Sequence, residues 1–148
     1  MPRIERTAQI GWEGNLARGL GTLSAGSGAF SELGYSLATR IGQPEGKTSP
    51  EELLAAAHGG CLTMSVAGEL TAAETPPGRI DATCRIVMDE VPGQGHQIVG
   101  SQVELVVSAD GLDDDGLRAA LAKADEGCPF SALLRRAGAD VQSSARLG

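Results

Sequence analysis

The stretch TSPEELLAAAHGGCLTMSVAGELTAA, residues 48–73, decides the fold. Ser49, Pro50 and Glu52 have the spacing of a helix start, in which serine caps the first turn, proline takes the first helical position and glutamate completes a capping box. Small and apolar residues then recur at steps of three and four, with little charge along the middle of the stretch. The pattern predicts one long helix that begins at Pro50, and its lack of charge predicts that this helix is central and buried.

Strands are predicted on both sides of this helix. We expect one hairpin over residues 6–12 and 16–24, followed by a third strand over residues 35–41. A second hairpin is expected over residues 80–88 and 97–108, and a closing strand over residues 139–145. Two shorter helices are predicted before the closing strand, over residues 112–126 and 130–136. A length of 148 residues suits a single domain over residues 1–148, large enough to bury a core without metal or disulfide bonds.

Composition and charge narrow the possible functions. The net charge of −7 opposes a phosphate backbone, so nucleic-acid binding is not expected. No signal pattern and no apolar run of about 18 residues is seen, so we expect a cytoplasmic protein without a membrane partner. Aromatic residues make up 3% of the chain, and a core so poor in aromatic side chains is small for a monomer, which favours a core shared between two copies.

The three cysteines do not read as a structural disulfide framework, because the cytoplasm keeps thiols reduced. Cys128 precedes Pro129, so its sulfur is expected at a helix N-cap, where free N–H groups and the helix dipole stabilise a thiolate. Cys61 lies about three turns into the long helix, so its thiolate would need a cation supplied by tertiary structure. Cys84 lies in an alternating strand and is expected to pack as a small apolar side chain.

The remaining candidate residues are weaker. His58 precedes Cys61 by three positions and could serve as a base, although a histidine that satisfies its hydrogen bonds in helix packing is the more common case. The two histidines, His58 and His96, are isolated, so no metal site is expected. The glycines near residues 19–28 fall between strands, so no nucleotide cofactor is indicated either.

Several motifs together resemble one family. Residues 48–61, ending in His58-Gly59-Gly60-Cys61, and the later Gly127-Cys128-Pro129-Phe130-Ser131 are similar to the OsmC/Ohr family of hydroperoxide reductases. Trp12-Glu13-Gly14 with Arg18-Gly19, and residues 35–40, look like its OsmC branch. The resemblance implies an α+β fold, with two antiparallel hairpins or three-stranded sheets around a long central helix. It also implies an intertwined homodimer with active sites at the interface.

The resemblance further implies a catalytic role for four residues. Cys61 would be the peroxidatic thiol and Cys128 the resolving one, the reverse of what the helix N-cap alone favours. Arg40 would supply the positive charge at Cys61, with Arg18 as the alternative, and Glu51 would hold the arginine. Ten helical residues rise about 15 Å, so Glu51 cannot reach Cys61 along one straight helix. It would then act from a bent helix or from the other chain, or it would simply favour the positive end of its helix.

The implied activity is a thiol-dependent peroxidase without a permanent cofactor. It would reduce organic hydroperoxides, and hydrogen peroxide as a further candidate, through a Cys61 sulfenic acid and a Cys61–Cys128 disulfide. An external dithiol resembling a lipoyl protein would reopen the disulfide, and Arg18 and His58 would contact substrate. Two other functions stay open: a non-catalytic stress-related module that binds a hydrophobic ligand, and a thiol redox sensor.

Overall fold

The computed structural model describes residues 1–148. The chain forms two compact units, Met1–Pro50 and Glu51–Gly148. Each unit has its own three-stranded sheet, and the chain contains one long helix. The α+β architecture expected from the sequence is therefore confirmed. That residues 1–148 form a single domain stays a prediction.

The first unit is an antiparallel sheet with one short helix. The unit comprises the strands β1 (Ala8–Glu13), β2 (Leu20–Ala25) and β3 (Leu33–Tyr35) and the helix α1 (Leu37–Ile41). The three strands lie in the order β1, β2, β3 across the sheet. The turn between β1 and β2 is closed by Asn15, whose side chain accepts the Arg18 backbone N–H at 2.9 Å. Gly14 takes a φ of 91°, which favours glycine. The predicted first hairpin is confirmed.

The third strand predicted over residues 35–41 is wrong for most of its length. β3 ends at Tyr35, and Ser36 caps α1 with a side chain that accepts the Thr39 backbone N–H at 3.2 Å. Over so few residues an alternation of apolar and polar side chains also fits one turn of helix, and the capping serine decides between them. Arg40 therefore lies in the last turn of a helix.

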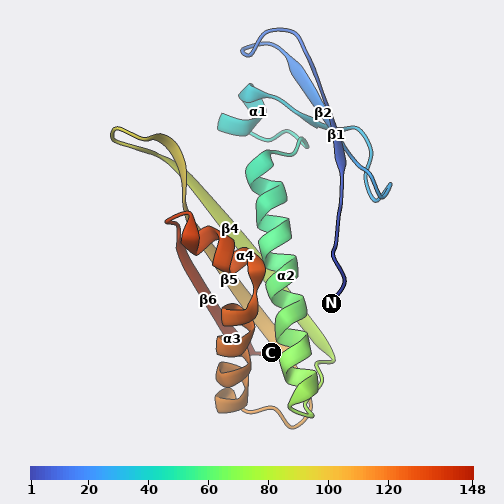
Figure 1. Ribbon diagram of the computed structural model, residues 1–148, viewed down its shortest axis with the longest axis vertical. Helices are drawn as coiled ribbons and strands as arrows, with labels where there is room; N and C mark the ends of the chain where they lie inside the picture. The colour runs from blue at the N-terminus through green and yellow to red at the C-terminus, as the bar shows by residue number, and fades with distance from the viewer. The chain divides into compact units, whose positions relative to one another are not determined.

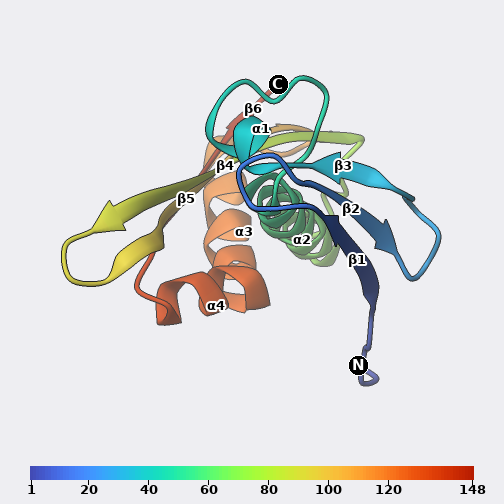
Figure 2. The same cartoon turned by 90° about the horizontal axis from the view of Figure 1, so that it is seen from above.

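The second unit packs three helices against one sheet. Its elements are α2 (Pro50–Ala72), β4 (Arg79–Val91), β5 (Gly95–Ser108), α3 (Asp114–Gly127), α4 (Pro129–Arg136) and β6 (Asp140–Leu147). In Figures 1 and 2 the three helices lie on the same side of this sheet. Every element predicted for this part of the chain is present, with shifts of a few residues at the ends.

Strand β6 joins the sheet in a way that the sequence did not indicate. β4 and β5 pair antiparallel, whereas β6 pairs parallel with β5, from Gly100 opposite Asp140 to Val107 opposite Leu147. Parallel neighbours need a crossover connection, and α3 and α4 supply it. The crossover carries Cys128 over the face of the sheet on which α2 lies.

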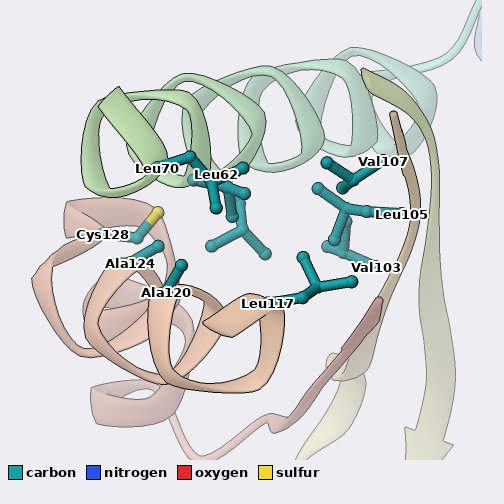
Figure 3. Packing of buried hydrophobic residues seen from close by; sticks show 10 residues of the cluster. Leu62, Leu70, Val103, Leu105, Val107, Leu117, Ala120, Ala124 and Cys128 are labelled. Carbon is teal, nitrogen blue, oxygen red and sulfur yellow. The ribbon is translucent and has the colours of Figure 1, made fainter. Parts of the chain in front are cut away.

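The core of this unit lies between α2, the sheet and α3. Its buried members are aliphatic or small: Leu62, Val66, Leu70, Val103, Leu105, Val107, Leu117, Ala120, Ala124 and Cys128. Alternate residues of β5 face inward, as expected for a strand with one covered face. In Figure 3 the sulfur of Cys128 points toward α2. The thiol is thus part of the core.

Helix α2 is less buried than its sequence predicted. By length and composition alone it would be long and apolar enough to cross a membrane, but its buried side chains pack in the core just described. Within the single chain 28% of its most apolar window is buried, and Met64 is 77% exposed. Complete burial is therefore not reached inside one chain, because the sheet and α3 cover one side of the helix and leave apolar residues outside.

Candidate active site

Helices α2 and α4 bring two cysteines together. Cys61 lies about three turns into α2, Cys128 is the N-cap residue of α4, and the two thiols are joined by a side-chain hydrogen bond. Cys61 is partly exposed, whereas Cys128 is 0% exposed. Residues 67 positions apart in the sequence (128 − 61) thus form a thiol pair that solvent reaches from the Cys61 side.

The surroundings of Cys61 act on its thiol in opposite directions. Burial raises the pKa of Cys61 above its ordinary value, and the neighbouring Cys128 raises it further. The backbone N–H of Phe130 lowers the pKa, because it donates a hydrogen bond that favours a thiolate. The nearby hydroxyl of Ser65 also lowers the pKa, and it donates to the backbone carbonyl of Cys61 at 3.1 Å. The balance is a raised pKa for the Cys61 thiol, and all the groups that cause it lie within residues 51–148.

The contact of Phe130 shows which cysteine receives a hydrogen bond from the N-terminus of α4. Phe130 lies in the first turn of α4, where backbone N–H groups have no partner within the helix. Cys128 makes no side-chain cap hydrogen bond, and the Phe130 N–H is directed to Cys61 instead. The sequence correctly placed Cys128 at the N-cap. The first turn of α4 nevertheless donates a hydrogen bond to Cys61, through the Phe130 N–H, and not to Cys128. The sequence could not show this.

His58 lies one turn before Cys61 on α2 and is 0% exposed. Its Nδ1 is 2.6 Å from Ser101 Oγ on β5, and its Nε2 is 2.9 Å from Ser131 Oγ on α4. Both ring nitrogens are therefore occupied, and neither is available to act as a base toward Cys61. These contacts favour the packing interpretation of His58, and its contact with substrate stays a prediction.

The burial of His58 predicts a pH dependence of stability. Desolvation lowers the pKa of His58 from 6.5, opposed by the Asp125 carboxylate and assisted by the Arg135 guanidinium. The stability contributed by neutral His58 is therefore complete above about pH 6.5 and is lost as pH falls through the lower folded-state pKa. We expect the free energy of unfolding of the native chain to fall more steeply between pH 7 and pH 5 than that of His58→Gln. Denaturant titrations of both proteins at each pH measure this difference, and equal slopes would contradict it.

The third cysteine lies on the sheet beneath α2. Cys84 Sγ on β4 is 3.7 Å from Ser101 Oγ, and a Cβ added to Gly59 would come within 3.0 Å of the Cys84 Cβ. Gly59 therefore allows α2 to approach β4 closely at this point. Gly59 and Gly60 both border an open cavity of about 560 Å³ next to Cys84, and a Cβ added to Gly60 would meet nothing within 4 Å. No group of three or more His, Cys, Asp and Glu side chains is placed to hold a metal ion.

The two candidate arginines both lie in the first unit. Arg18 is exposed in the turn between β1 and β2. Arg40, also exposed, borders a cavity of about 320 Å³ whose other lining residues are Trp12, Leu16, Tyr35, Ser36 and Leu37. The rings of Trp12 and Tyr35 are 5.5 Å apart. Of the two arginines, Arg40 is the one that lines this partly aromatic cavity.

Glu51 lies in the first turn of α2 and is partly buried. Because α2 is one continuous helix from Pro50 to Ala72, the ten residues from Glu51 to Cys61 rise about 15 Å. Glu51 is thus too far along the helix to touch the Cys61 thiol of its own chain. An effect of Glu51 on that thiol would have to pass through another charged group.

Comparison with known proteins places this chain in a family. The family model described as OsmC-like protein matches residues 42–144. The proteins named Peroxiredoxin OsmC from Escherichia coli strain K12 and from Shigella flexneri are each 35% identical over 132 residues, which cover 89% of this chain and 91% of the relative.

Solved structures with the same fold cover nearly the whole chain. An organic hydroperoxide resistance protein OsmC from Legionella pneumophila has a TM-score of 0.75 at 22% identity, covering 97% of this chain and 98% of that one. An organic hydroperoxide resistance protein from Elizabethkingia anophelis has a TM-score of 0.78 at 17% identity, with complete coverage of both chains. The matched residues, the sequence identity and the shared fold agree, and the chain belongs to the OsmC-like protein family.

Proposed function

We propose that this protein is a thiol peroxidase that reduces organic hydroperoxides with Cys61 as the attacking thiol and Cys128 as the resolving thiol. Family membership and relatives named as peroxiredoxins support a peroxidase or other redox role. The finer assignment rests on the site. A partly exposed thiol that is hydrogen-bonded to a fully buried thiol is the arrangement that a two-cysteine cycle requires.

The difference in exposure between the two thiols carries the assignment of roles. A hydroperoxide with a bulky organic group must reach the sulfur that attacks it, and Cys128 is 0% exposed. Cys61 is partly exposed and receives the Phe130 N–H, which stabilises a negative sulfur. Cys61 is therefore better placed for the attack, and Cys128 is better placed to meet a product formed on Cys61.

The cycle has three steps. The Cys61 thiolate attacks the distal peroxide oxygen, the O–O bond breaks, and the departing alkoxide takes a proton to leave an alcohol and a Cys61 sulfenic acid. The Cys128 thiol then attacks the sulfenic sulfur, which forms the Cys61–Cys128 disulfide and releases water. An external dithiol, of the kind that a lipoyl protein carries, reduces this disulfide by thiol–disulfide exchange and becomes a disulfide itself. Hydrogen peroxide would enter the same cycle and release water in the first step.

A cation is proposed to complete the site, because burial and the neighbouring Cys128 raise the pKa of Cys61. We propose Arg40 for this role, since its guanidinium stays charged at every relevant pH and borders a cavity with aromatic walls. Arg18 is the alternative. Glu51 is proposed to hold the arginine rather than to touch Cys61.

A homodimer is part of the proposal. The apolar residues of α2 that the single chain leaves uncovered, with Met64 77% exposed, need a partner surface. A second copy of the chain supplies one, and it would let an arginine of either chain serve a given Cys61. The cytoplasmic location stays a prediction.

Turnover tests the proposed function directly. We expect the native chain to consume many equivalents of an alkyl hydroperoxide when dihydrolipoamide is supplied, and to consume about one equivalent without it. After the single oxidation, digestion under non-reducing conditions should give a cross-linked peptide pair containing Cys61 and Cys128, about 2 Da lighter than the two thiol peptides. Cys84→Ser is the matched control, and it should turn over like the native chain.

The other candidate functions predict different outcomes. A redox sensor would form the disulfide once and turn over slowly even with abundant dithiol, whereas a ligand-binding module would consume no peroxide at all. A Cys61–Cys84 cross-link would contradict the proposed pairing.

A further inference from the structure

A chain of hydrogen bonds runs from the buried His58 out to the surface and has a fixed direction. Asp125 accepts the Ser131 hydroxyl hydrogen at 2.7 Å, and its other carboxylate oxygen accepts an N–H of the Arg135 guanidinium. Because the only hydrogen of the Ser131 hydroxyl is committed to Asp125, Ser131 Oγ must accept from His58 Nε2–H. The neutral ring then accepts at Nδ1, and the Ser101 hydroxyl donates to it.

Two neighbouring contacts join α2 to α4. One is the thiol pair, Cys61 with Cys128, and the other is the hydrogen bond between His58 and Ser131. The two contacts are separated by three residues on each helix, since 61 − 58 = 3 and 131 − 128 = 3. About one helical turn therefore separates them on both sides, so the position of one contact constrains the other.

We propose that His58 is a positioning residue: its Nε2–H···Ser131 hydrogen bond fixes α4 against α2 and so holds the Cys128 sulfur and the Phe130 N–H at Cys61. The inference rests on the proposed function and assigns His58 a part in it. His58 is 0% exposed, and its two ring nitrogens bond to Ser101 and Ser131 rather than to either thiol, so it acts through the position of α4. The contact with Ser101 anchors the other side of the ring to the sheet and does not involve α4.

Positioning matters because two reactions compete for the Cys61 sulfenic acid. Cys128 condenses with it to give the disulfide and water, whereas a second hydroperoxide oxidises it to a sulfinic acid and leaves an alcohol. The first reaction depends on how often the Cys128 sulfur lies within reach, and the second depends on peroxide concentration. Loosening α4 should therefore raise the share of sulfinic acid, and it should change the rate of the first attack on peroxide much less.

Two substitutions of His58 separate its two hydrogen bonds. In His58→Gln an amide N–H lies near the former Nε2 and still donates to Ser131, whereas in His58→Asn the amide oxygen lies near the former Nδ1 and accepts only from Ser101. Each variant retains one buried hydrogen bond and loses the other. Ser131→Ala and Ser101→Ala form a second pair that removes the same two contacts from the opposite side.

The first measurement is the fate of Cys61 after a dose of excess alkyl hydroperoxide. Mass spectrometry gives the ratio of sulfinic acid, about 32 Da heavier, to the Cys61–Cys128 disulfide, about 2 Da lighter. We expect His58→Asn and Ser131→Ala to raise this ratio about tenfold or more over the native chain. His58→Gln and Ser101→Ala should stay within about twofold of it. A ratio that follows the melting temperature of the four variants, rather than this pairing, overturns the proposal.

The second measurement does not depend on peroxide chemistry. In buffers of reduced and oxidised dithiothreitol, the equilibrium constant for forming the Cys61–Cys128 disulfide reports how often the two sulfurs meet. His58→Asn and Ser131→Ala should lower it about tenfold, with His58→Gln and Ser101→Ala near the native value. If the native chain consumed no hydroperoxide, the proposed function would fail. The equilibrium constant would still show whether His58 positions the two sulfurs. Equal constants in all four variants would rule that role out.

Discussion

Replacement of Cys61 by serine is expected to lower hydroperoxide reduction at least about a thousandfold, because a hydroxyl has no significant anionic form at neutral pH and is a poor nucleophile toward peroxide oxygen. Replacement of Cys128 by serine should have a different effect. The first oxidation should proceed at nearly the native rate, and dithiol recycling should slow sharply because the sulfenic acid has no partner thiol. Stopped-flow consumption of an alkyl hydroperoxide, with and without dihydrolipoamide, separates the two variants.

The two cysteine variants also decide which thiol attacks. The N-cap position of Cys128 favours that residue when only local sequence is considered, whereas its complete burial and the direction of the Phe130 N–H favour Cys61. A Cys128→Ser variant that lost its first oxidation, together with a Cys61→Ser variant that kept it, would reverse the roles. Capture of the sulfenic acid by a dimedone-type reagent in Cys128→Ser would place the oxidised sulfur on Cys61 directly.

Replacement of Arg40 by alanine is the second change with a large expected effect. Burial and Cys128 raise the pKa of Cys61, so a nearby cation is needed to populate the thiolate at neutral pH. Its loss should slow peroxide consumption about ten- to a thousandfold at pH 7, since each unit of thiol pKa changes the thiolate fraction about tenfold. Because removing a cation raises the pKa, the rate–pH curve should move to higher pH and the variant should recover part of its activity in alkaline buffer.

Arg18→Ala is the matched control for this prediction, as it removes an exposed arginine of the same unit that does not line the Arg40 cavity. Arg40→Lys should keep part of the activity, because it retains the charge but not the planar guanidinium. A loss of activity in Arg18→Ala with none in Arg40→Ala would transfer the role to Arg18. A loss that does not recover with pH would indicate that the arginine binds substrate rather than activating the thiol.

Local signals in the sequence predicted most of the elements. The start of α2 at Pro50 and the start of α4 after Cys128 both follow from proline at the first helical position. The hairpin of β4 and β5 follows from alternation around a glycine-rich turn. The prediction of a strand over residues 35–41 is wrong because the same alternation fits a short helix, and Ser36 caps that helix.

The parts of the site that could not be predicted depend on contacts between distant residues. Ser101 and Ser131 lie 43 and 73 positions from His58, and no local pattern marks two ordinary serines as its partners. The parallel pairing of β6 likewise has no signature in its own residues, since an alternating strand fits either direction. The meeting of Cys61 with Cys128 was inferred from family resemblance, while the donation of the Phe130 N–H to Cys61 needed the structure.

The parallel pairing of β6 with β5 has a consequence for the newly made polypeptide. Cys128 lies in the crossover between those strands, so it is fixed over α2 only when β6, which is synthesised after it, has joined the sheet. A parallel pair of this kind closes a long loop and forms late in folding. While the chain is still leaving the ribosome, Cys61 therefore has neither the Cys128 thiol nor the Phe130 N–H beside it. A sulfenic acid formed on Cys61 at that stage would have no Cys128 thiol to condense with, so the proposed two-thiol cycle becomes possible only after β6 has joined the sheet.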